Sequence, residues 1–192
     1  RPGMTVLDSC AAPGGKTVGT AMLMQNKGKI ISCDIHEKKL RLIRENTNRL
    51  GIHIVETRAM DARKAHEDMV DHFDMIIADV PCSGYGIIRK KPDIRYKNLE
   101  ELKQLPALQL AILENQATYV KKGGVLLYST CTVLKAENEK IVEAFLENHQ
   151  DFYTEPLELP EVFPKNETGM LTLIPSEYDT DGFFISRLRR KV

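Results

Sequence analysis

The stretch 8-DSCAAPGGKT-17 begins within the last residues of the first predicted strand, 4-MTVLDSC-10, and continues beyond it. A glycine-rich turn between a first strand and a helix is where doubly wound α/β folds bind their cofactor. Two phosphate-binding motifs do not fit this turn. A phosphate loop requires glycine five residues before Gly15, where Cys10 stands, and 14-GGKTVG-19 is not G-x-G-x-x-G. The turn therefore predicts a cofactor site that does not rest on a phosphate motif.

Short apolar runs alternate with amphipathic stretches of helix length along the first 150 residues, which is typical of a parallel sheet with helices on both faces. We expect strands at 4–10, 29–35, 53–60, 73–80 and 123–131, and helices at 36–51, 98–124 (interrupted at Pro106) and 135–149. Two later runs, 170–175 and 183–190, are separated by a turn too short for a crossover helix, so they should pair antiparallel. The prediction is an α/β, Rossmann-like fold with a mainly parallel seven-stranded sheet.

Length and composition limit the alternatives. The 192 residues, 42% of them apolar, suit one domain covering 1–192, and no apolar run reaches the roughly 20 residues of a membrane span. The chain starts Arg-Pro-Gly, which suggests a fragment of a longer protein. Its four cysteines lie far apart, so we expect no metal site and no disulfide framework, and a cytoplasmic location. The net charge of zero argues against nucleic-acid binding by bulk electrostatics alone.

Three acids, Asp34, Asp61 and Asp79, each stand at the end of a successive predicted strand. An acid after the second strand suits the ribose hydroxyls of an adenosine, and Asp61 would lie near the adenine edge. An adenosine ligand without a phosphate motif suggests S-adenosylmethionine. A single such acid is more often a turn or cap residue, but three in series favour a ligand site.

Two cysteines follow neighbouring predicted strands, Cys82 in 79-DVPC-82 and Cys131 in 129-STC-131. A lone cysteine is usually a small buried hydrophobe, as we expect for Cys33, but a pair beside an acid indicates chemistry. Methylation of a pyrimidine at C5 needs a thiolate that adds to C6, an acid near N3 and a base for the C5 proton. Spacing alone does not rank the two thiols.

These motifs, together with 79-DVPCSGYGIIRKKPDIRY-96, 129-STCTVLKAEN-138 and 181-DGFFISRL-188, resemble the RNA 5-methylcytosine methyltransferases of the Nol/Nop/Sun family, and in particular its bacterial ribosomal RNA branch. The resemblance implies a class I methyltransferase in which Cys131 is the nucleophile, Cys82 assists proton removal and product release, and Asp79 touches cofactor and base. It further implies an RNA-binding portion N-terminal to this domain. The residues implied to hold S-adenosylmethionine are Cys10, Ala11, Ala12, Pro13, Gly14, Gly15, Lys16, Asp34, Asp61 and Asp79.

The basic segment after Cys82 is then expected to contact the RNA backbone through Arg89, Lys90, Lys91 and Arg95, with Tyr85 or Tyr96 as stacking partners. Its alternative is a solvated loop. The expected partner is ribosomal RNA, the expected protein is monomeric, and no membrane is involved. Other possibilities are a tRNA substrate, a methyltransferase for exocyclic amines or proteins, and a non-catalytic RNA-binding module.

Overall fold

The computed structural model describes residues 1–163 and 165–192, and these contain one sheet of eight strands. The strands are β1 (Thr5–Asp8), β2 (Lys29–Asp34), β3 (Val55–Ala59), β4 (Phe73–Asp79), β5 (Val120–Thr130), β6 (Phe152–Thr154), β7 (Met170–Leu173) and β8 (Phe183–Arg190). Their order is β3-β2-β1-β4-β5-β8-β6, and β7 also pairs with β8. The first five strands are parallel, and β8 is antiparallel to β5, β6 and β7.

The predicted fold class and the antiparallel pairing of the last two predicted strands are confirmed. The predicted number of seven strands is one too few. Strand β6 pairs with Leu188–Arg190 and β7 with Phe183–Ser186, so the two share one edge of β8. The sheet is therefore seven positions wide, and its last position is divided between two short strands.

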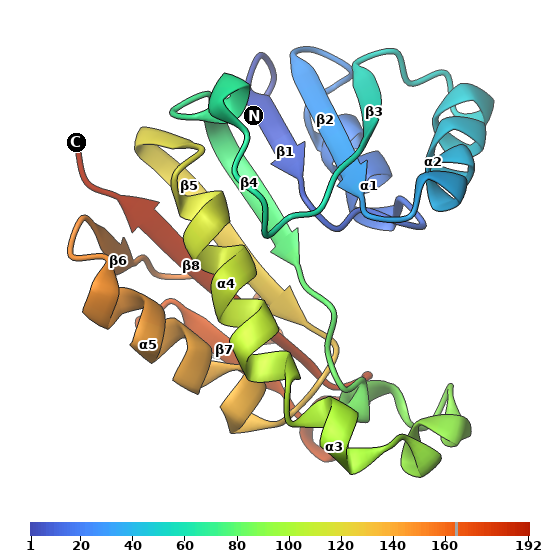
Figure 1. Cartoon of the computed structure of the whole chain (residues 1–192), viewed down its shortest axis with the longest axis vertical. Helices are drawn as coiled ribbons and strands as arrows, with labels where there is room; N and C mark the ends of the chain where they lie inside the picture. Colours follow the sequence, from blue (N-terminus) through green and yellow to red (C-terminus); the bar gives the residue numbers. More distant parts are fainter. Residues whose placement is uncertain (164) are drawn as a thin grey trace.

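Helices cover both faces of the sheet (Figure 1). The α-helices are α1 (Gly15–Leu23), α2 (Glu37–Arg49), α3 (Leu99–Leu102), α4 (Leu105–Ala117), α5 (Glu139–Asn148) and α6 (Pro175–Tyr178), and the 3-10 helices are η1 (Glu67–Met69), η2 (Tyr85–Ile87), η3 (Pro92–Tyr96) and η4 (Lys135–Glu137). Alternate residues of one strand face opposite ways, so in β1 Val6 belongs to the apolar cluster that includes Ala21 of α1, whereas Leu7 belongs to the one that includes Ile112 of α4. Apolar burial on both faces explains the continuous apolar strands.

The segment 98–124 differs from its prediction. The predicted interruption occurs, but it lies before Pro106, between α3 and α4, and Pro106 stands in the first turn of α4, where a missing backbone N–H costs nothing. Helix α4 ends at Ala117, and β5 begins at Val120 rather than at Gly123. The paired glycines therefore lie inside a strand, where the register against β4 shifts between Phe73 and Met75.

Candidate active site

The loop after β1 is tied to the end of β2. The backbone N–H of Ala11 donates to the Cys33 carbonyl at 2.7 Å, and the N–H of Ala12 donates to Oδ2 of Asp34 at 3.3 Å. Gly14 has a φ of 105°, and a Cβ there would lie 3.2 Å from Cγ1 of Ile43. Glycine therefore allows both the left-handed turn and the close approach of α2. Directly after this turn α1 begins, with its N-terminal N–H groups at the same end of the sheet.

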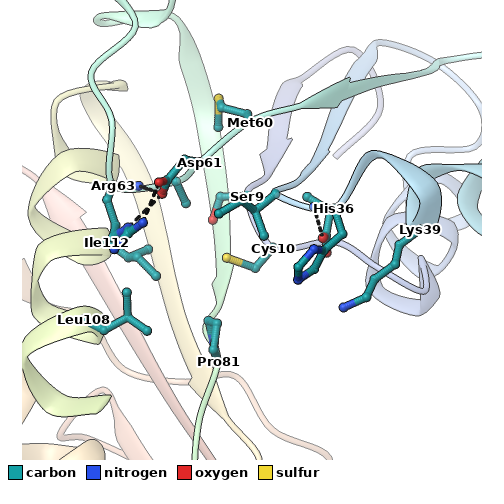
Figure 2. Close-up of a pocket in the computed structure, with 13 residues that line it drawn as sticks. Ser9, Cys10, His36, Lys39, Met60, Asp61, Arg63, Pro81, Leu108 and Ile112 are labelled. Carbon is teal, nitrogen blue, oxygen red and sulfur yellow. Dashed lines mark hydrogen bonds and ion pairs between the residues drawn. The ribbon is translucent and has the colours of Figure 1, made fainter. Parts of the chain in front are cut away.

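A pocket of about 380 Å³ lies at the carboxyl ends of β1, β2 and β3 (Figure 2). Two of the three predicted acids line it, Asp34 and Asp61, together with Cys10. Its apolar lining includes Met60, Ala62, Pro81, Leu108 and Ile112. A pocket that combines apolar surface for a flat ring with carboxylates for hydroxyl groups suits an adenosine.

Asp34 both stabilises a turn and lines the pocket, the two roles that an acid at the end of a strand can have. Its Oδ1 accepts a hydrogen bond from the His36 N–H at 2.9 Å, which is the turn role, while the side chain also lines the pocket. The two backbone bonds, from His36 and Ala12, hold the carboxylate in one orientation. A residue that shapes the turn can therefore also present its carboxylate to a ligand.

Asp61 forms a bidentate ion pair with Arg63, two residues further along the chain (Figure 2). The guanidinium donates from Nε to Oδ1 at 2.9 Å and from Nη2 to Oδ2 at 2.7 Å. These bonds lower the pKa of Asp61 to about 2. The carboxylate stays charged and oriented at any physiological pH, and sequence reasoning did not identify the arginine that does this.

Asp8 was not among the predicted site residues, because it lies inside an apolar strand. Its side chain is fully buried and accepts a hydrogen bond from Thr17 Oγ1 at 2.7 Å on Oδ2, whereas Oδ1 has no hydrogen-bond partner in the described part of the chain. Burial raises the pKa of Asp8 to about 6. A buried acid with a free oxygen beneath the cofactor loop is suited to a ligand that carries positive charge.

Asp79 is separated from the other two predicted acids. It does not line the pocket, and its carboxylate accepts hydrogen bonds from Lys16 Nζ at 2.6 Å and from Ser129 Oγ at 2.7 Å. Lys16, predicted to hold the cofactor, thus reaches from the loop to the end of β4. The pairing places Asp79 between the loop and the strand that leads to Cys131.

The two predicted thiols lie together, with 3.1 Å between Sγ of Cys82 and Sγ of Cys131, and both are free. The backbone N–H of Cys131 also donates to Cys82 Sγ at 3.3 Å. The hydrogen bond from Cys82 lowers the pKa of Cys131 to about 7, and the same bond raises the pKa of Cys82 above its usual range. This hydrogen bond therefore favours ionisation of Cys131 and disfavours ionisation of Cys82.

The other two cysteines behave as structural residues. Burial raises the pKa of both Cys10 and Cys33 to about 12. Cys33 is fully buried inside β2, as expected, and Cys10 faces the pocket (Figure 2). Neither thiol is ionised near neutral pH, so neither resembles a nucleophile.

The predicted RNA-contacting residues are exposed on the loop that contains η2 and η3. Two of them are paired within the chain: Arg89 lies 3.6 Å from Asp179, and Lys90 lies 2.5 Å from Asp181. Lys91 and Arg95 make no ion pair among the described residues. Tyr96 is 88% exposed and Tyr85 is partly buried, so Tyr96 offers the more accessible ring.

A doubly wound sheet with oriented acids at the ends of β2 and β3, an apolar adenine-sized pocket and no phosphate motif defines a Rossmann-like S-adenosylmethionine-dependent methyltransferase. Within that class the chain belongs to the 16S rRNA methyltransferase RsmB/F family, whose model matches residues 1–189. The predicted family resemblance and cofactor are confirmed at this level. The oriented acids, together with the free oxygen of Asp8, fit this positively charged cofactor.

Individual relatives agree. The chain is 48% identical over 193 residues to a probable ribosomal RNA small subunit methyltransferase B of Bacillus subtilis (strain 168), covering 97% of this chain and 43% of that protein. It is 36% identical over 196 residues to a ribosomal RNA small subunit methyltransferase F of Aeromonas salmonicida (strain A449), covering 99% and 41%. The crystal structure of NSun6 from Pyrococcus horikoshii with SFG matches with a TM-score of 0.85 and 34% identity, covering 97% and 48%. The chain thus spans less than half of each relative.

No helix in the described ranges 1–163 and 165–192 combines the length and the apolar character needed to cross a membrane. The same residues contain no group of three or more His, Cys, Asp or Glu side chains placed to hold a metal ion.

Proposed function

We propose that this chain transfers a methyl group from S-adenosylmethionine to C5 of a cytidine in small subunit ribosomal RNA, through a covalent bond between Cys131 and C6. The observation that carries the proposal is the pair of thiols 3.1 Å apart at the ends of adjacent strands β4 and β5, beside Asp79. A methyltransferase acting on an exocyclic amine has no use for such a pair. Membership of the RsmB/F family supports ribosomal RNA as the substrate.

The chain's own residues account for each step at the base. The Cys131 thiolate adds to C6, the electron pair of the C5–C6 double bond shifts toward C5, and Asp79 in its protonated form donates a hydrogen bond to N3, where negative charge develops. S-adenosylmethionine supplies the methyl group to C5. The C5 proton is then lost to solvent with the assistance of Cys82, its electron pair re-forms the C5–C6 double bond, and the Cys131–C6 bond breaks with its electron pair returning to the Cys131 sulfur. The hydrogen bond from Cys82 stabilises the departing thiolate.

RNA binding is assigned to the exposed basic loop. Lys91 and Arg95 are available for phosphate oxygens, and RNA would have to displace Asp179 and Asp181 from Arg89 and Lys90. The Arg89–Asp179 pair is exposed, so its loss costs little, whereas Asp181 is only 12% exposed and its pair with Lys90 costs more to break. A flipped base can stack on Tyr96, whose ring faces solvent.

Adduct trapping tests the mechanism. The protein is incubated with S-adenosylmethionine and a small subunit RNA transcript, and covalent complexes are separated on a denaturing gel. We expect Cys131→Ala to lose both methylation and adduct, and Cys82→Ala to accumulate adduct. An adduct seen only with the Cys131 variant would show that Cys82 is the nucleophile and Cys131 assists release.

Two further measurements test the substrate and the class. Bisulfite mapping of ribosomal RNA and tRNA from cells lacking the full-length protein should show loss of one or more 5-methylcytidines in small subunit RNA. Loss only in tRNA would show that tRNA is the substrate instead of ribosomal RNA. Calorimetry should detect S-adenosylmethionine binding. A non-catalytic RNA-binding module would show none.

A further inference from the structure

A buried carboxylate lies behind the Cys82 loop. Glu137, at the end of η4, is 3% exposed, and its Oε2 accepts hydrogen bonds from the Ser83 N–H at 2.9 Å and from Gln109 Nε2 at 2.8 Å. Gln109 Nε2 also donates to the Pro81 carbonyl at 2.9 Å. The residues on both sides of Cys82 are thus held by one carboxylate and one amide.

The next residue, Asn138, does the same for the Cys131 loop. Its Nδ2 donates to the Thr132 carbonyl at 3.0 Å, and its Oδ1 accepts from Thr130 Oγ1 at 2.7 Å. Ser83 Oγ donates to Thr132 Oγ1 at 2.8 Å, which joins the two loops directly. All of these side chains are buried. Two consecutive residues, Glu137 and Asn138, therefore hold one cysteine loop each.

A carboxylate is an expensive group to bury unless its hydrogen bonds are strong and complete. Glu137 has no ion-pair partner in the described part of the chain, and its Oε2 accepts one hydrogen bond from the Cys82 loop and one from the glutamine that holds this loop. An ionised acceptor gives shorter and stronger hydrogen bonds than a neutral one. Hydrogen bonds of this kind fix the backbone on both sides of Cys82 and therefore restrict the position of its side chain.

We propose that Glu137, acting with Gln109, is a positioning residue that sets the distance between the sulfur atoms of Cys82 and Cys131, and thereby the balance between formation and release of the RNA adduct. The release part of this inference rests on the proposed function. The positioning part does not, because it concerns the geometry of the thiols in the free protein. Neither Glu137 nor Gln109 is in hydrogen-bond contact with a sulfur atom; both act through the backbone of residues 81–83.

Helix α4 provides a matched control. Gln116, two turns after Gln109, is equally buried and donates from Nε2 to a backbone carbonyl at 2.8 Å, but that carbonyl belongs to Ala62 beside the cofactor pocket. Gln109→Leu and Gln116→Leu remove the same chemistry from the same helix. Only the first should affect the thiols, and only the second should weaken S-adenosylmethionine binding.

The first measurement is the rate at which glutathione disulfide converts the two thiols to a Cys82–Cys131 disulfide without RNA, which releases two glutathione thiols per disulfide formed. We expect Gln109→Leu and Glu137→Ala to slow this rate about tenfold, the size expected when a buried hydrogen-bonding group is left unpaired. Glu137→Gln keeps the acceptor oxygen and should stay within about threefold of the unmodified protein. Asp79 and Lys16 face the thiols as well, and remain in every variant.

The second measurement is the fraction of protein trapped as RNA adduct at steady state, which should rise for Gln109→Leu and not for Gln116→Leu. Equal effects of the two glutamine variants on the thiols would overturn the inference and leave Gln109 a purely structural residue. If the disulfide rates respond but no methylation of RNA occurs in the unmodified protein, the proposed function fails and the positioning stands. If Glu137→Ala does not fold, Gln109→Leu and Glu137→Gln carry the test.

Discussion

Nζ of Lys16 lies 2.6 Å from Oδ2 of Asp79, so the cofactor loop is ion-paired to the acid beside the two thiols. Lys16 stands in the first turn of α1, and Asp79 ends β4. The side chains are 44% and 32% exposed, so water screens the pair and its contribution to folding is small. Its value is geometric, because it links the loop proposed to hold the cofactor to the acid proposed to face the target base.

Lys16→Met is therefore expected to affect catalysis more than cofactor binding. We expect kcat to fall about five- to tenfold while the Kd for S-adenosylmethionine changes less than about threefold, because Asp79 loses its orienting partner. Lys39→Met is the comparison, since Lys39 lines the pocket on the side of α2. Its effect should appear in Kd and leave kcat unchanged. Equal loss of affinity in both variants would assign Lys16 to the cofactor alone.

Arg63→Met should weaken the Kd for S-adenosylmethionine about three- to tenfold at pH 7, because Asp61 loses the two bonds that orient it. The arginine also holds the pKa of Asp61 at about 2, so in the unmodified protein the contribution of Asp61 to affinity should not change as pH falls from 8 to 5. In the variant this pKa returns toward its ordinary value, and affinity should begin to fall near pH 5. Arg58→Met, which removes the ion pair between Arg58 of β3 and Asp68 of η1, outside the pocket, should leave Kd unchanged.

Asp8 provides a prediction about stability. Its folded-state pKa of about 6 is above the ordinary aspartate value of 3.8, so the native state binds the proton more tightly than the unfolded chain. That stabilisation is fully present below pH 3.8 and is lost as pH rises through 6. Asp8→Asn cannot ionise and keeps an acceptor for Thr17, so it should be more stable than the unmodified protein at pH 8, by on the order of 1–2 kcal/mol. Denaturant unfolding without cofactor at pH 5 and pH 8 measures this; a difference of equal size at both pH values would contradict it.

The periodic features of the sequence predicted most of the fold. Strands buried on both faces read as apolar runs, and acids at their ends predicted one edge of the sheet as the site. Strand β6 is not predicted because three residues are too few to show an alternation of apolar and polar side chains. The predicted start of β5 is too far along the chain because Gly123 and Gly124 resemble the end of a helix. Local patterns of this kind do not show which pairing a long strand will adopt.

The candidate site was predicted in its residue types and less well in its contacts. Asp34 and Asp61 line the pocket, whereas Asp79 pairs with Lys16, because the direction of a side chain at a strand end depends on its neighbours in space. Asp8 and Glu137 were not identified, since an acid within an apolar strand or a polar loop carries no periodic signal. Their roles follow only from burial and from partners up to 54 residues away, as in the bond from Ser83 to Glu137.

The ionisation of Cys131 can be measured directly. Its pKa is lowered to about 7 by the Cys82 hydrogen bond, so its alkylation by iodoacetamide should rise with pH through a midpoint near 7. Cys82→Ala removes the donor, and the midpoint should move upward toward that of an ordinary thiol. Peptide mass spectrometry separates the four cysteines; Cys10 and Cys33 should stay unlabelled because their pKa values are about 12. A midpoint that does not move in Cys82→Ala would show that another group sets the pKa.

The separation of 3.1 Å between the two sulfur atoms also predicts sensitivity to oxidation. Hydrogen peroxide oxidises two thiols to one disulfide and is reduced to two molecules of water, and only a short movement is needed to bring the sulfur atoms to the roughly 2.05 Å of a disulfide. We expect peroxide to abolish methylation, and dithiothreitol to restore it fully, with one Cys82–Cys131 linkage per chain by mass spectrometry. Cys82→Ala cannot form that linkage, so its Cys131 should oxidise past the sulfenic acid and lose the capacity to form adduct irreversibly. Reversible protection in that variant would show that a partner other than Cys82 traps the oxidised sulfur.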